Sequence, residues 1–279
     1  MEIKVKTPAK INLTLEILNK RPDGFHNIQS IMQMIDLYDY LTINVEDSTE
    51  TKIELSGTSD EIPYDEKNLV YKAAKLFLDK TKIENKLIKV FIEKNIPISA
   101  GLAGGSTNAA GTLFGLNKLF NNILSTEELH ELCSQLGSDL NVCLEGGCLL
   151  ATSRGEVISK LPFRENPVSL IKPENLGISA KEAYTKFSQL EKKPDLDMTF
   201  KMIDSIKIGT DVRQFLHNDL EVAVFGDYPE LQKIKKLVPK SIMSGSGSTY
   251  FVISSTVPNI EGYWKKDGLK FIADGVSEV

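Results

Sequence analysis

The stretch from Asn95 to Leu116, N-I-P-I-S-A-G-L-A-G-G-S-T-N-A-A-G-T-L-F-G-L, decides the fold. It predicts a short loop with three glycines, then two hydroxyl residues and a helix of small residues; these are Gly101, Gly104, Gly105, Ser106 and Thr107. Glycine lets successive backbone N–H groups turn toward one anion. Ser106 or Thr107 can cap the helix, whose positive end favours phosphate. The alternative is a capped turn without a ligand, but these features together favour a phosphate site.

Exclusion narrows the possible kinds of phosphate site. A P-loop ends in Gly-Lys-Ser/Thr, and the chain has no Gly-Lys dipeptide; the spacing G-x-x-G-G also differs from the dinucleotide fingerprint G-x-G-x-x-G. The segment P-I-S-A-G-L-A-G-G-S-T-N-A-A resembles the second motif of the GHMP small-molecule kinases, written P-x-x-x-G-L-x-S/G-S-S/T. In that family the motif wraps the triphosphate of ATP.

Composition and charge narrow the class of protein. The 279 residues carry a formal net charge of −5, which disfavours a general binder of nucleic acid or of anionic membranes. No apolar run approaches the ~20 residues that span a bilayer, and the N-terminus M-E-I-K-V-K-T lacks a signal-peptide core. We therefore expect a cytoplasmic protein with a small-molecule substrate, without nucleic-acid or membrane partners, and monomeric or weakly dimeric.

The cysteines indicate neither a disulfide framework nor a metal site. Cys133, Cys143 and Cys148 form no C-x-x-C pair, and their number is odd. A zinc site is disfavoured because the chain has three histidines, dispersed at His26, His130 and His217. We expect buried thiols in a reducing compartment.

The pattern of elements favours an α+β fold over a doubly wound sheet, because strands and helices do not alternate regularly. Strands are predicted at 2–7 and 11–18 (interrupted at Pro8), 39–45, 51–56, 86–94, 147–152 and 167–172. Helices are predicted after the caps Asn68, Ser125 and Ser179, from the glycine loop to about Phe120, and in further segments to about Lys236. The tail from Ile260 to Ala273 predicts one more helix and a strand. We place a domain boundary after the turn at Gly155.

One face of the second strand is polar along its length. Lys10, Asn12, Thr14 and Glu16 share it, while the opposite face is apolar. Such a face can point to water, or it can form the floor of a polar cleft.

A turn follows this strand in R-P-D-G-F-H, where proline presets φ and glycine takes the left-handed position. It delivers Phe25 and His26 side by side. They form either a partly buried corner or a flat stacking surface with a hydrogen-bonding neighbour, which suits a nucleobase.

Asp139 lies in L-G-S-D-L, a short link between a helix and an apolar segment. An aspartate at such a place commonly caps a helix. A catalytic carboxylate is the alternative.

The resemblance extends beyond the glycine loop. P-A-K-I-N-L, R-P-D-G-F-H, L-G-S-D-L and M-S-G-S-G-S-T occur in the order found in the GHMP kinases that phosphorylate 4-diphosphocytidyl-2-C-methyl-D-erythritol, in the non-mevalonate isoprenoid pathway. General GHMP kinases share the loop but not D-G-F-H. The resemblance implies a two-domain fold, with a ribosomal-protein-S5-like nucleotide domain at residues 1–155 and an α/β sandwich-like domain at residues 156–279.

The resemblance also implies roles for residues. Lys10 and Asp139 correspond to the catalytic pair. The ATP site corresponds to Asn68, near adenine, and to the phosphate loop Pro97, Ile98, Ser99, Ala100, Gly101, Leu102, Ala103, Gly104, Gly105, Ser106 and Thr107. The substrate site corresponds to Asn12, to Phe25 and His26 on cytosine, and to Tyr184 as a second stacking ring. Gly245 and Gly247 match the third GHMP motif.

Three positions depart from the family pattern. Asn141 stands where proline is usual, which would loosen the segment that holds Asp139. Thr107 replaces a commoner serine and keeps the hydroxyl, and Ser248 stands where proline or alanine is frequent. None of these changes removes a reacting group.

The implied reaction uses ATP as co-substrate and Mg²⁺ on its phosphates, with Asp139 taking the substrate's hydroxyl proton and Lys10 offsetting charge. The protein ligands of the Mg²⁺ remain unassigned. Two alternatives stay open: another GHMP kinase acting on mevalonate, homoserine or a sugar, and a non-catalytic nucleotide-binding protein of the same fold.

Overall fold

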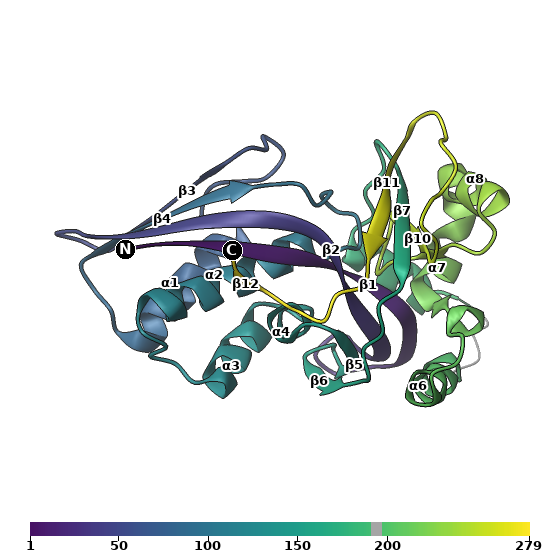
Figure 1. The fold of residues 1–279 in the computed structure, drawn as a ribbon, viewed down its shortest axis with the longest axis horizontal. Helices are drawn as coiled ribbons and strands as arrows, with labels where there is room; N and C mark the ends of the chain where they lie inside the picture. The colour runs from purple at the N-terminus through teal and green to yellow at the C-terminus, as the bar shows by residue number, and fades with distance from the viewer. Residues whose placement is uncertain (191–196) are drawn as a thin grey trace.

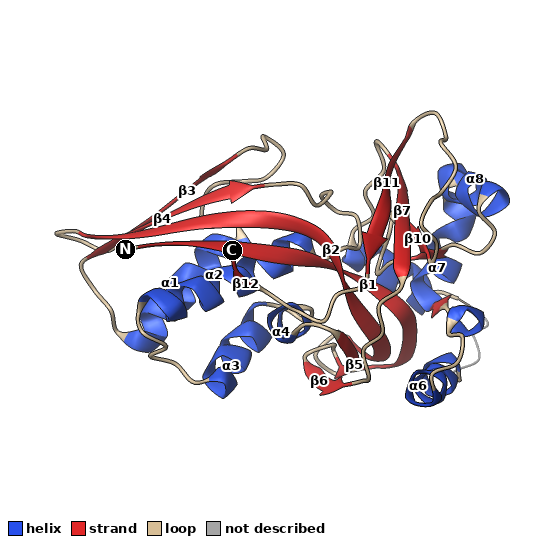
Figure 2. Ribbon diagram, viewed as in Figure 1, coloured by secondary structure: helices blue, strands red, loops and turns tan. Residues whose placement is uncertain are grey.

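The computed structural model describes residues 1–190 and 197–279. Figure 1 shows an elongated molecule in which a long sheet with helices beneath it adjoins a second group of strands and helices. Figure 2 shows that strands and helices do not alternate regularly along the chain, which confirms the α+β class.

Two long antiparallel strands form the spine of the molecule. β1 is Glu2–Lys20 and β2 is His26–Asp47. The prediction of a strand break at Pro8 was wrong, because a register shift between Pro8 and Ala9 accommodates the proline within one continuous strand. The Pro-Asp-Gly turn joins the strands as predicted, with Gly24 at φ 88°.

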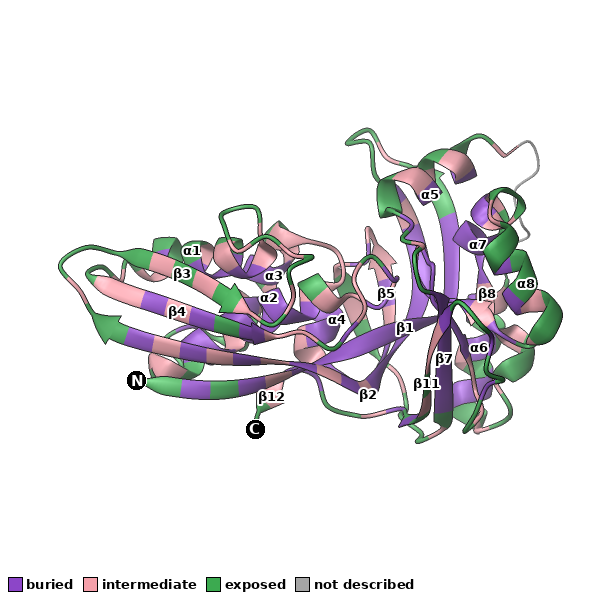
Figure 3. Cartoon of the chain, turned by 90° about the horizontal axis from the view of Figure 1, so that it is seen from above, coloured by how far each residue is buried: buried purple, intermediate pink, exposed green. Residues whose placement is uncertain are grey.

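The spine belongs to the larger of the two sheets found in the described residues. Its main strand order is β12-β1-β2-β4-β3. In addition, β5 pairs with β2, β6 pairs with β5, and β8 pairs with β1. The added strands are β3 (Lys52–Gly57), β4 (Lys86–Glu93), β5 (Cys148–Ser153), β6 (Val157–Lys160), β8 (His217–Asn218) and β12 (Ser277–Glu278). Figure 3 shows that β1 is buried along its middle, where both of its faces are covered.

Helices from the first half of the chain cover one face of the long sheet (Figure 1). They are α1 (Leu69–Thr81), α2 (Gly104–Leu119), α3 (Thr126–Leu136) and α4 (Leu140–Glu145). The predicted caps of α1 and α3 are confirmed: Asn68 accepts from the Val70 N–H, and Ser125 forms a capping box with Glu128. These helices therefore begin where local sequence specifies.

The second sheet has the order β11-β7-β10-β9. Its strands are β7 (Pro167–Pro173), β9 (Ile242–Met243), β10 (Tyr250–Val252) and β11 (Tyr263–Lys270). Around it lie α5 (Ala180–Ser188), α6 (Met198–Ile208), η1 (Arg213–Phe215), α7 (Asp219–Val224), η2 (Phe225–Asp227) and α8 (Pro229–Leu237). Ser179 caps α5 as predicted, accepting from the Glu182 N–H. The predicted tail helix is wrong, because those residues form β11, paired with β7.

The two parts of the chain share the large sheet. β8 pairs in parallel with β1 at Thr14 and Leu15, and β12 pairs with β1 near the N-terminus. The chain thus returns twice to β1 after residue 155. The boundary after Gly155 remains a prediction.

Candidate active site

The polar face of β1 is buried. Lys10, Asn12, Thr14 and Glu16 are each at most 3% exposed, so the expectation that this face could point to water is wrong. Thr14 and Glu16 bind α6, since the Thr14 and Thr199 hydroxyls are 2.9 Å apart and Glu16 accepts from the Met198 N–H at 2.7 Å. Lys10 and Asn12 instead line a cleft of about 760 Å³.

The Lys10 ammonium is held by three oxygens at the floor of this cleft. It donates to Asn12 Oδ1 at 2.7 Å and to the Gly101 carbonyl at 3.2 Å, and it lies 3.4 Å from Asp139 Oδ2. Asp139 occupies the N-cap position of α4, but its side chain makes no capping hydrogen bond. The carboxylate that could have capped the helix pairs with Lys10 instead.

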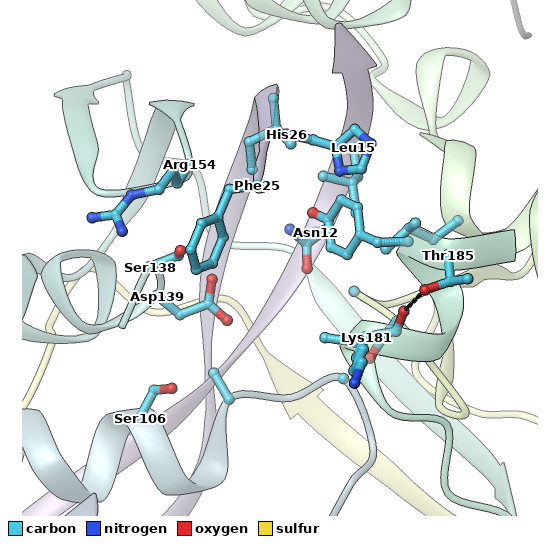
Figure 4. A pocket seen from close by; sticks show the side chains of 18 of the residues that line it. Asn12, Leu15, Phe25, His26, Ser106, Ser138, Asp139, Arg154, Lys181 and Thr185 are labelled. Carbon is cyan, nitrogen blue, oxygen red and sulfur yellow. Dashed lines mark hydrogen bonds between the residues drawn. The ribbon is translucent and has the colours of Figure 1, made fainter. Parts of the chain in front are cut away.

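The orientation of Asn12 is fixed from both ends of its amide. Its Oδ1 accepts from Lys10, and its Nδ2 donates to Ser30 Oγ at 2.8 Å. Ser30 in turn donates to the Thr14 carbonyl at 2.5 Å. Figure 4 shows Asn12, Phe25 and Asp139 around the same cavity, with Lys181 and Thr185 of α5 on its other side.

The glycine loop forms a second cavity of about 250 Å³. Its lining includes Lys94 and eleven of the predicted ATP residues: Asn68, Pro97, Ile98, Ser99, Ala100, Gly101, Leu102, Ala103, Gly104, Gly105 and Ser106. Thr107, also predicted for this site, is buried within α2. The loop thus encloses a space that a phosphate chain could enter.

The start of α2 differs from the prediction. The N-cap residue is Ala103, at φ 59°, and it makes no side-chain cap, so the expected capping by Ser106 or Thr107 is wrong. The helix begins at Gly104, so its first-turn N–H groups have no capping side chain, and Gly104, Gly105 and Ser106 line the cavity. Gly101 must remain glycine, because its φ is +74° and a Cβ there would lie 1.9 Å from the Ser244 carbonyl oxygen.

Asp39 fixes the backbone that leads into this loop, and the sequence did not predict this role. It is fully buried on β2 and accepts from the N–H groups of Asn95 and Ile96 at 2.6 and 2.7 Å. It also pairs with Lys94 at 2.8 Å. Burial lowers the pKa of Lys94, and the Asp39 charge opposes that shift.

The far end of the large cleft carries the predicted aromatic residues. Phe25 is 53% exposed, and the Arg154 guanidinium lies over its ring at 5.2 Å from the centroid. His26 and Tyr184 stack with centroids 5.3 Å apart and planes 19° apart, and Ser188 Oγ lies 3.1 Å from His26 Nε2. Phe25, His26 and Tyr184 therefore line one cavity, and Tyr184 already contacts His26.

The sequence did not indicate several polar residues of the cleft, among them Arg154, Lys181 and Ser246. Arg154 comes from the turn between β5 and β6, Lys181 from the first turn of α5, and Ser246 from the third glycine motif. Arg154 lies in the S-R-G-E turn, where the sequence indicates only a domain boundary. A charged residue beside a turn glycine was the available signal.

The two cavities meet at the glycine loop. Gly101, Ala103 and Ser106 line both of them. A ligand in the small cavity and a ligand in the large cleft would thus approach each other beside Lys10 and Asp139. Such an arrangement suits transfer of a group between two bound molecules.

The comparisons with known proteins agree with this geometry. Residues 68–147 match the family described as GHMP kinases N terminal domain. The chain is 40% identical to 4-diphosphocytidyl-2-C-methyl-D-erythritol kinase of Bacillus cereus (strain B4264) over 260 residues, covering 90% of this chain and 88% of the relative. It is 41% identical to the kinase of the same name from Clostridioides difficile (strain 630) over 259 residues, covering 89% and 86%. The chain belongs to the 4-diphosphocytidyl-2-C-methyl-D-erythritol kinase family.

Solved structures agree on the fold. A crystal structure of 4-(cytidine 5'-diphospho)-2C-methyl-D-erythritol kinase matches with a TM-score of 0.73 at 28% identity, covering 91% of this chain and 90% of that one. A homoserine kinase from Cytophaga hutchinsonii matches with a TM-score of 0.77, covering 100% and 97%, but at 18% identity it supports the fold alone. The predicted GHMP-kinase fold is confirmed.

Family membership confirms the kinase activity expected from the sequence, with ATP as co-substrate. It gives no support to the alternatives of another GHMP substrate or of a non-catalytic protein. Within the part of the chain that the structure describes, no helix is long and apolar enough to cross a membrane.

Proposed function

We propose that this chain transfers the γ-phosphoryl group of ATP to the 2-hydroxyl of 4-diphosphocytidyl-2-C-methyl-D-erythritol where its two cavities meet. One observation carries the proposal: the Lys10–Asp139 pair stands in the large cleft directly beside Gly101, which lines both cavities. The nucleotide would occupy the small cavity and the acceptor alcohol the large cleft.

The glycine loop is proposed to hold the ATP phosphates. The first-turn N–H groups of α2 carry no side-chain cap, so they can donate to phosphate oxygens at the positive end of a helix. Asn68 lines the same cavity and caps α1 with its Oδ1, which fixes its side chain near the proposed adenine position.

Asp139 is proposed to accept the proton of the substrate hydroxyl. The oxygen then bonds to the γ-phosphorus as the bond from that phosphorus to the β–γ bridging oxygen breaks, and the proton stays on the Asp139 carboxylate. Lys10 would offset the negative charge on the group in transfer, since its ammonium is already held beside that carboxylate.

Mg²⁺ would bind with ATP and supply charge neutralisation on its phosphates. This ion prefers oxygen ligands and is commonly held by phosphates together with one or two carboxylates and water. Ser106 lines both cavities and offers a hydroxyl oxygen there.

The cytidine end of the substrate is proposed to lie at Phe25, His26 and Tyr184. Phe25 presents an exposed ring, Tyr184 a ring already stacked on His26, and Asn12 a fixed amide on the way to Lys10. Burial raises the pKa of the Tyr184 hydroxyl, so it stays uncharged beside the base.

The remaining expectations belong to the same proposal. Cys133, Cys143 and Cys148 are unpaired and buried, and burial raises the pKa of the Cys133 and Cys148 thiols to about 12. Such thiols fit a reducing cytoplasm. We propose a cytoplasmic monomer or weak homodimer without a nucleic-acid partner.

One assay tests the function directly. The protein is incubated with ATP, Mg²⁺ and the cytidyl substrate, and phosphorus NMR follows the new phosphate monoester while ADP release is measured. We expect both signals, and we expect cytidine nucleotides to compete with the substrate. ADP release with mevalonate, homoserine or a sugar, and none with the cytidyl substrate, would contradict the proposal.

A further inference from the structure

Residues 217–221, H-N-D-L-E, form β8 and the start of α7. They lie outside the family motifs quoted above but contact the catalytic region. The asparagine of this segment, Asn218, is 2% exposed. The Asn218 amide donates to the Met243 carbonyl at 2.6 Å and to the Gly245 carbonyl at 2.8 Å. Its Oδ1 accepts from the Leu220 N–H at 2.8 Å, which caps α7. Both ends of this side chain are thus engaged with backbone.

The loop that Asn218 holds touches Lys10. A Cβ on Gly245 would lie 3.2 Å from Lys10 Nζ and 3.0 Å from the Gly101 carbonyl oxygen, so the Gly245 backbone packs against both. The Gly101 carbonyl accepts from Lys10 at 3.2 Å and from Ser244 Oγ at 2.9 Å. A shift of this loop would therefore disturb the Gly101 carbonyl, which accepts from Lys10, and the Gly245 backbone, which packs against the ammonium.

The same segment also holds β1, the strand that carries Lys10. His217 and Asn218 pair in parallel with Thr14 and Leu15 of β1. Asp219 accepts from the Ile17 N–H at 2.7 Å. Residues 217–219 therefore connect the strand of Lys10 to the loop that packs against its ammonium.

Glu221 adds a second anchor on the loop. Its carboxylate accepts from the Met243 N–H at 2.9 Å and pairs with Lys235 at 2.9 Å. The Met243 peptide is thus held on its N–H side by Glu221 and on its carbonyl side by Asn218.

We propose that Asn218 is a positioning residue for phosphoryl transfer, acting through the Gly245 loop to hold Lys10 beside Asp139. The inference rests on the proposed function, in which that pair does the chemistry. Asparagine suits the place because it offers two donors to two carbonyls and an acceptor to the helix end. Aspartate would keep the acceptor and lose both donors, and serine would keep an acceptor but replace the two amide N–H donors with a single, shorter hydroxyl donor.

The test compares Asn218→Asp with Asn117→Asp. Asn117 is a matched control: it is 5% exposed and bonds Leu124 from both ends of its amide, at 3.0 and 2.9 Å, away from the cavities of the site. We expect Asn218→Asp to lower kcat about 10- to 100-fold, as misplacement by up to about 1 Å does, with little change in the Kd for ATP. Asn117→Asp should lower Tm and leave kcat near the wild-type value.

Asn218→Ser serves if the aspartate variant does not fold, because serine keeps the helix cap without adding charge. A folded Asn218 variant with normal kcat would overturn the inference. So would a loss of kcat that comes with an equal loss of ATP affinity. If the wild-type protein phosphorylates only a different alcohol, the proposed function fails, and the ratio of kcat values on that alcohol still tests Asn218.

Discussion

Lys10 carries its charge at a position almost closed to solvent. A buried ammonium is costly unless it is paired and hydrogen-bonded, and here three oxygens from Asn12, Gly101 and Asp139 surround it. Those oxygens come from a neighbouring residue on β1, from the glycine loop and from the start of α4. The ammonium is therefore immobilised at the point where three parts of the chain meet, which suits a group that must stabilise developing charge without rearranging.

Asp139→Asn should lower kcat by about 10²–10⁴, the usual contribution of a positioned proton acceptor. The fold should tolerate the change, because the Asp139 side chain makes no helix cap. The Kd for ATP should stay near the wild-type value, since Asp139 lines the large cleft and not the glycine-loop cavity. Steady-state kinetics and nucleotide titration check both statements. Near-normal turnover would remove Asp139 from the reaction.

Phe25→Ala should raise the KM for the cytidyl substrate about 5- to 150-fold, because stacking on one base contributes roughly 1–3 kcal/mol. The Tm should change little, because the Phe25 ring is 53% exposed and stacks against the Arg154 guanidinium at the surface of the cleft. The KM for ATP should not move. A variant that melts early and binds substrate normally would show a packing role instead.

Tyr184 differs from Phe25 in its surroundings and is the natural companion measurement. It stacks on His26 and packs against the main core, so Tyr184→Ala should lower both Tm and substrate affinity. Comparing Tm and substrate affinity for both variants distinguishes a ring that only binds substrate, Phe25, from one that also packs in the core, Tyr184.

At the residue level, the sequence predicted the catalytic side chains, which lie in motifs. It did not predict the residues that hold the catalytic region in place. Lys10 and Asp139 were predicted because their motifs carry them, and the structure brings them within 3.4 Å. Asp39 and Asn218 had no such signal. Their partners are separated from them along the chain by 56 and 27 residues, in the Asp39–Asn95 and Asn218–Gly245 bonds. Contacts of that range depend on tertiary packing.

At the scale of elements, α2 combines a phosphate-facing start with a close approach to β1 and β2. A Cβ on Gly111 would lie 2.4 Å from Thr7 Cγ2, and one on Gly115 would lie 2.6 Å from Ile43 Cδ1. These glycines allow the helix to lie against the sheet. The small-residue run after the glycine loop thus serves packing as well as ligand approach.

Gly111→Ala should destabilise the protein relative to Gly105→Ala by about 1–3 kcal/mol, the usual cost of overpacking a core. Both variants replace a glycine of α2 by alanine, so the gain in helix propensity is similar and largely cancels. At Gly105 the nearest atom to a new Cβ is Leu69 Cδ1 at 3.8 Å, which is ordinary contact. Denaturant unfolding of both variants gives the difference. Equal stability would contradict the close-packing argument.

Capped helices were the most predictable elements, and the longest strands and the tail were the least. Ser125 and Glu128 specify the start of α3 by themselves. Part of β11 was mistaken for a helix because its state depends on pairing with β7, which at Tyr263 and Pro173 joins residues 90 positions apart in the chain. Local pattern cannot supply that partner.

At the scale of the whole molecule, the cleft depends on contacts between early and late parts of the chain. Its floor is β1, and its opposite side is α5 with the third glycine loop. β8 and the start of α7 join these parts, through backbone pairing to Thr14 and Leu15 and through Asp219 to Ile17. A change that weakens this junction should therefore also disturb the geometry of the cleft.

His217 makes that junction sensitive to pH. Its Nε2 lies 2.6 Å from Asp219 Oδ1, and Glu16 and Glu221 add negative charge nearby. Burial by itself would lower the His217 pKa, but the hydrogen bond and charge of Asp219 outweigh it, so the pKa is raised above 6.5. Below 6.5 the histidine is protonated in both the folded and the unfolded chain, and the ion pair contributes fully to stability.

As pH rises above 6.5 through the raised pKa of the folded state, the folded protein loses that proton and the contribution disappears. We therefore expect His217→Gln to be less stable than wild type at acidic pH, with the difference in unfolding free energy shrinking as pH increases. Glutamine keeps a polar group near Asp219 but does not titrate, so the change in the difference isolates the histidine proton. Denaturant unfolding of both proteins across this range measures it. A difference that stays constant or grows with pH would show that His217 stabilises the junction by packing and not by its charge.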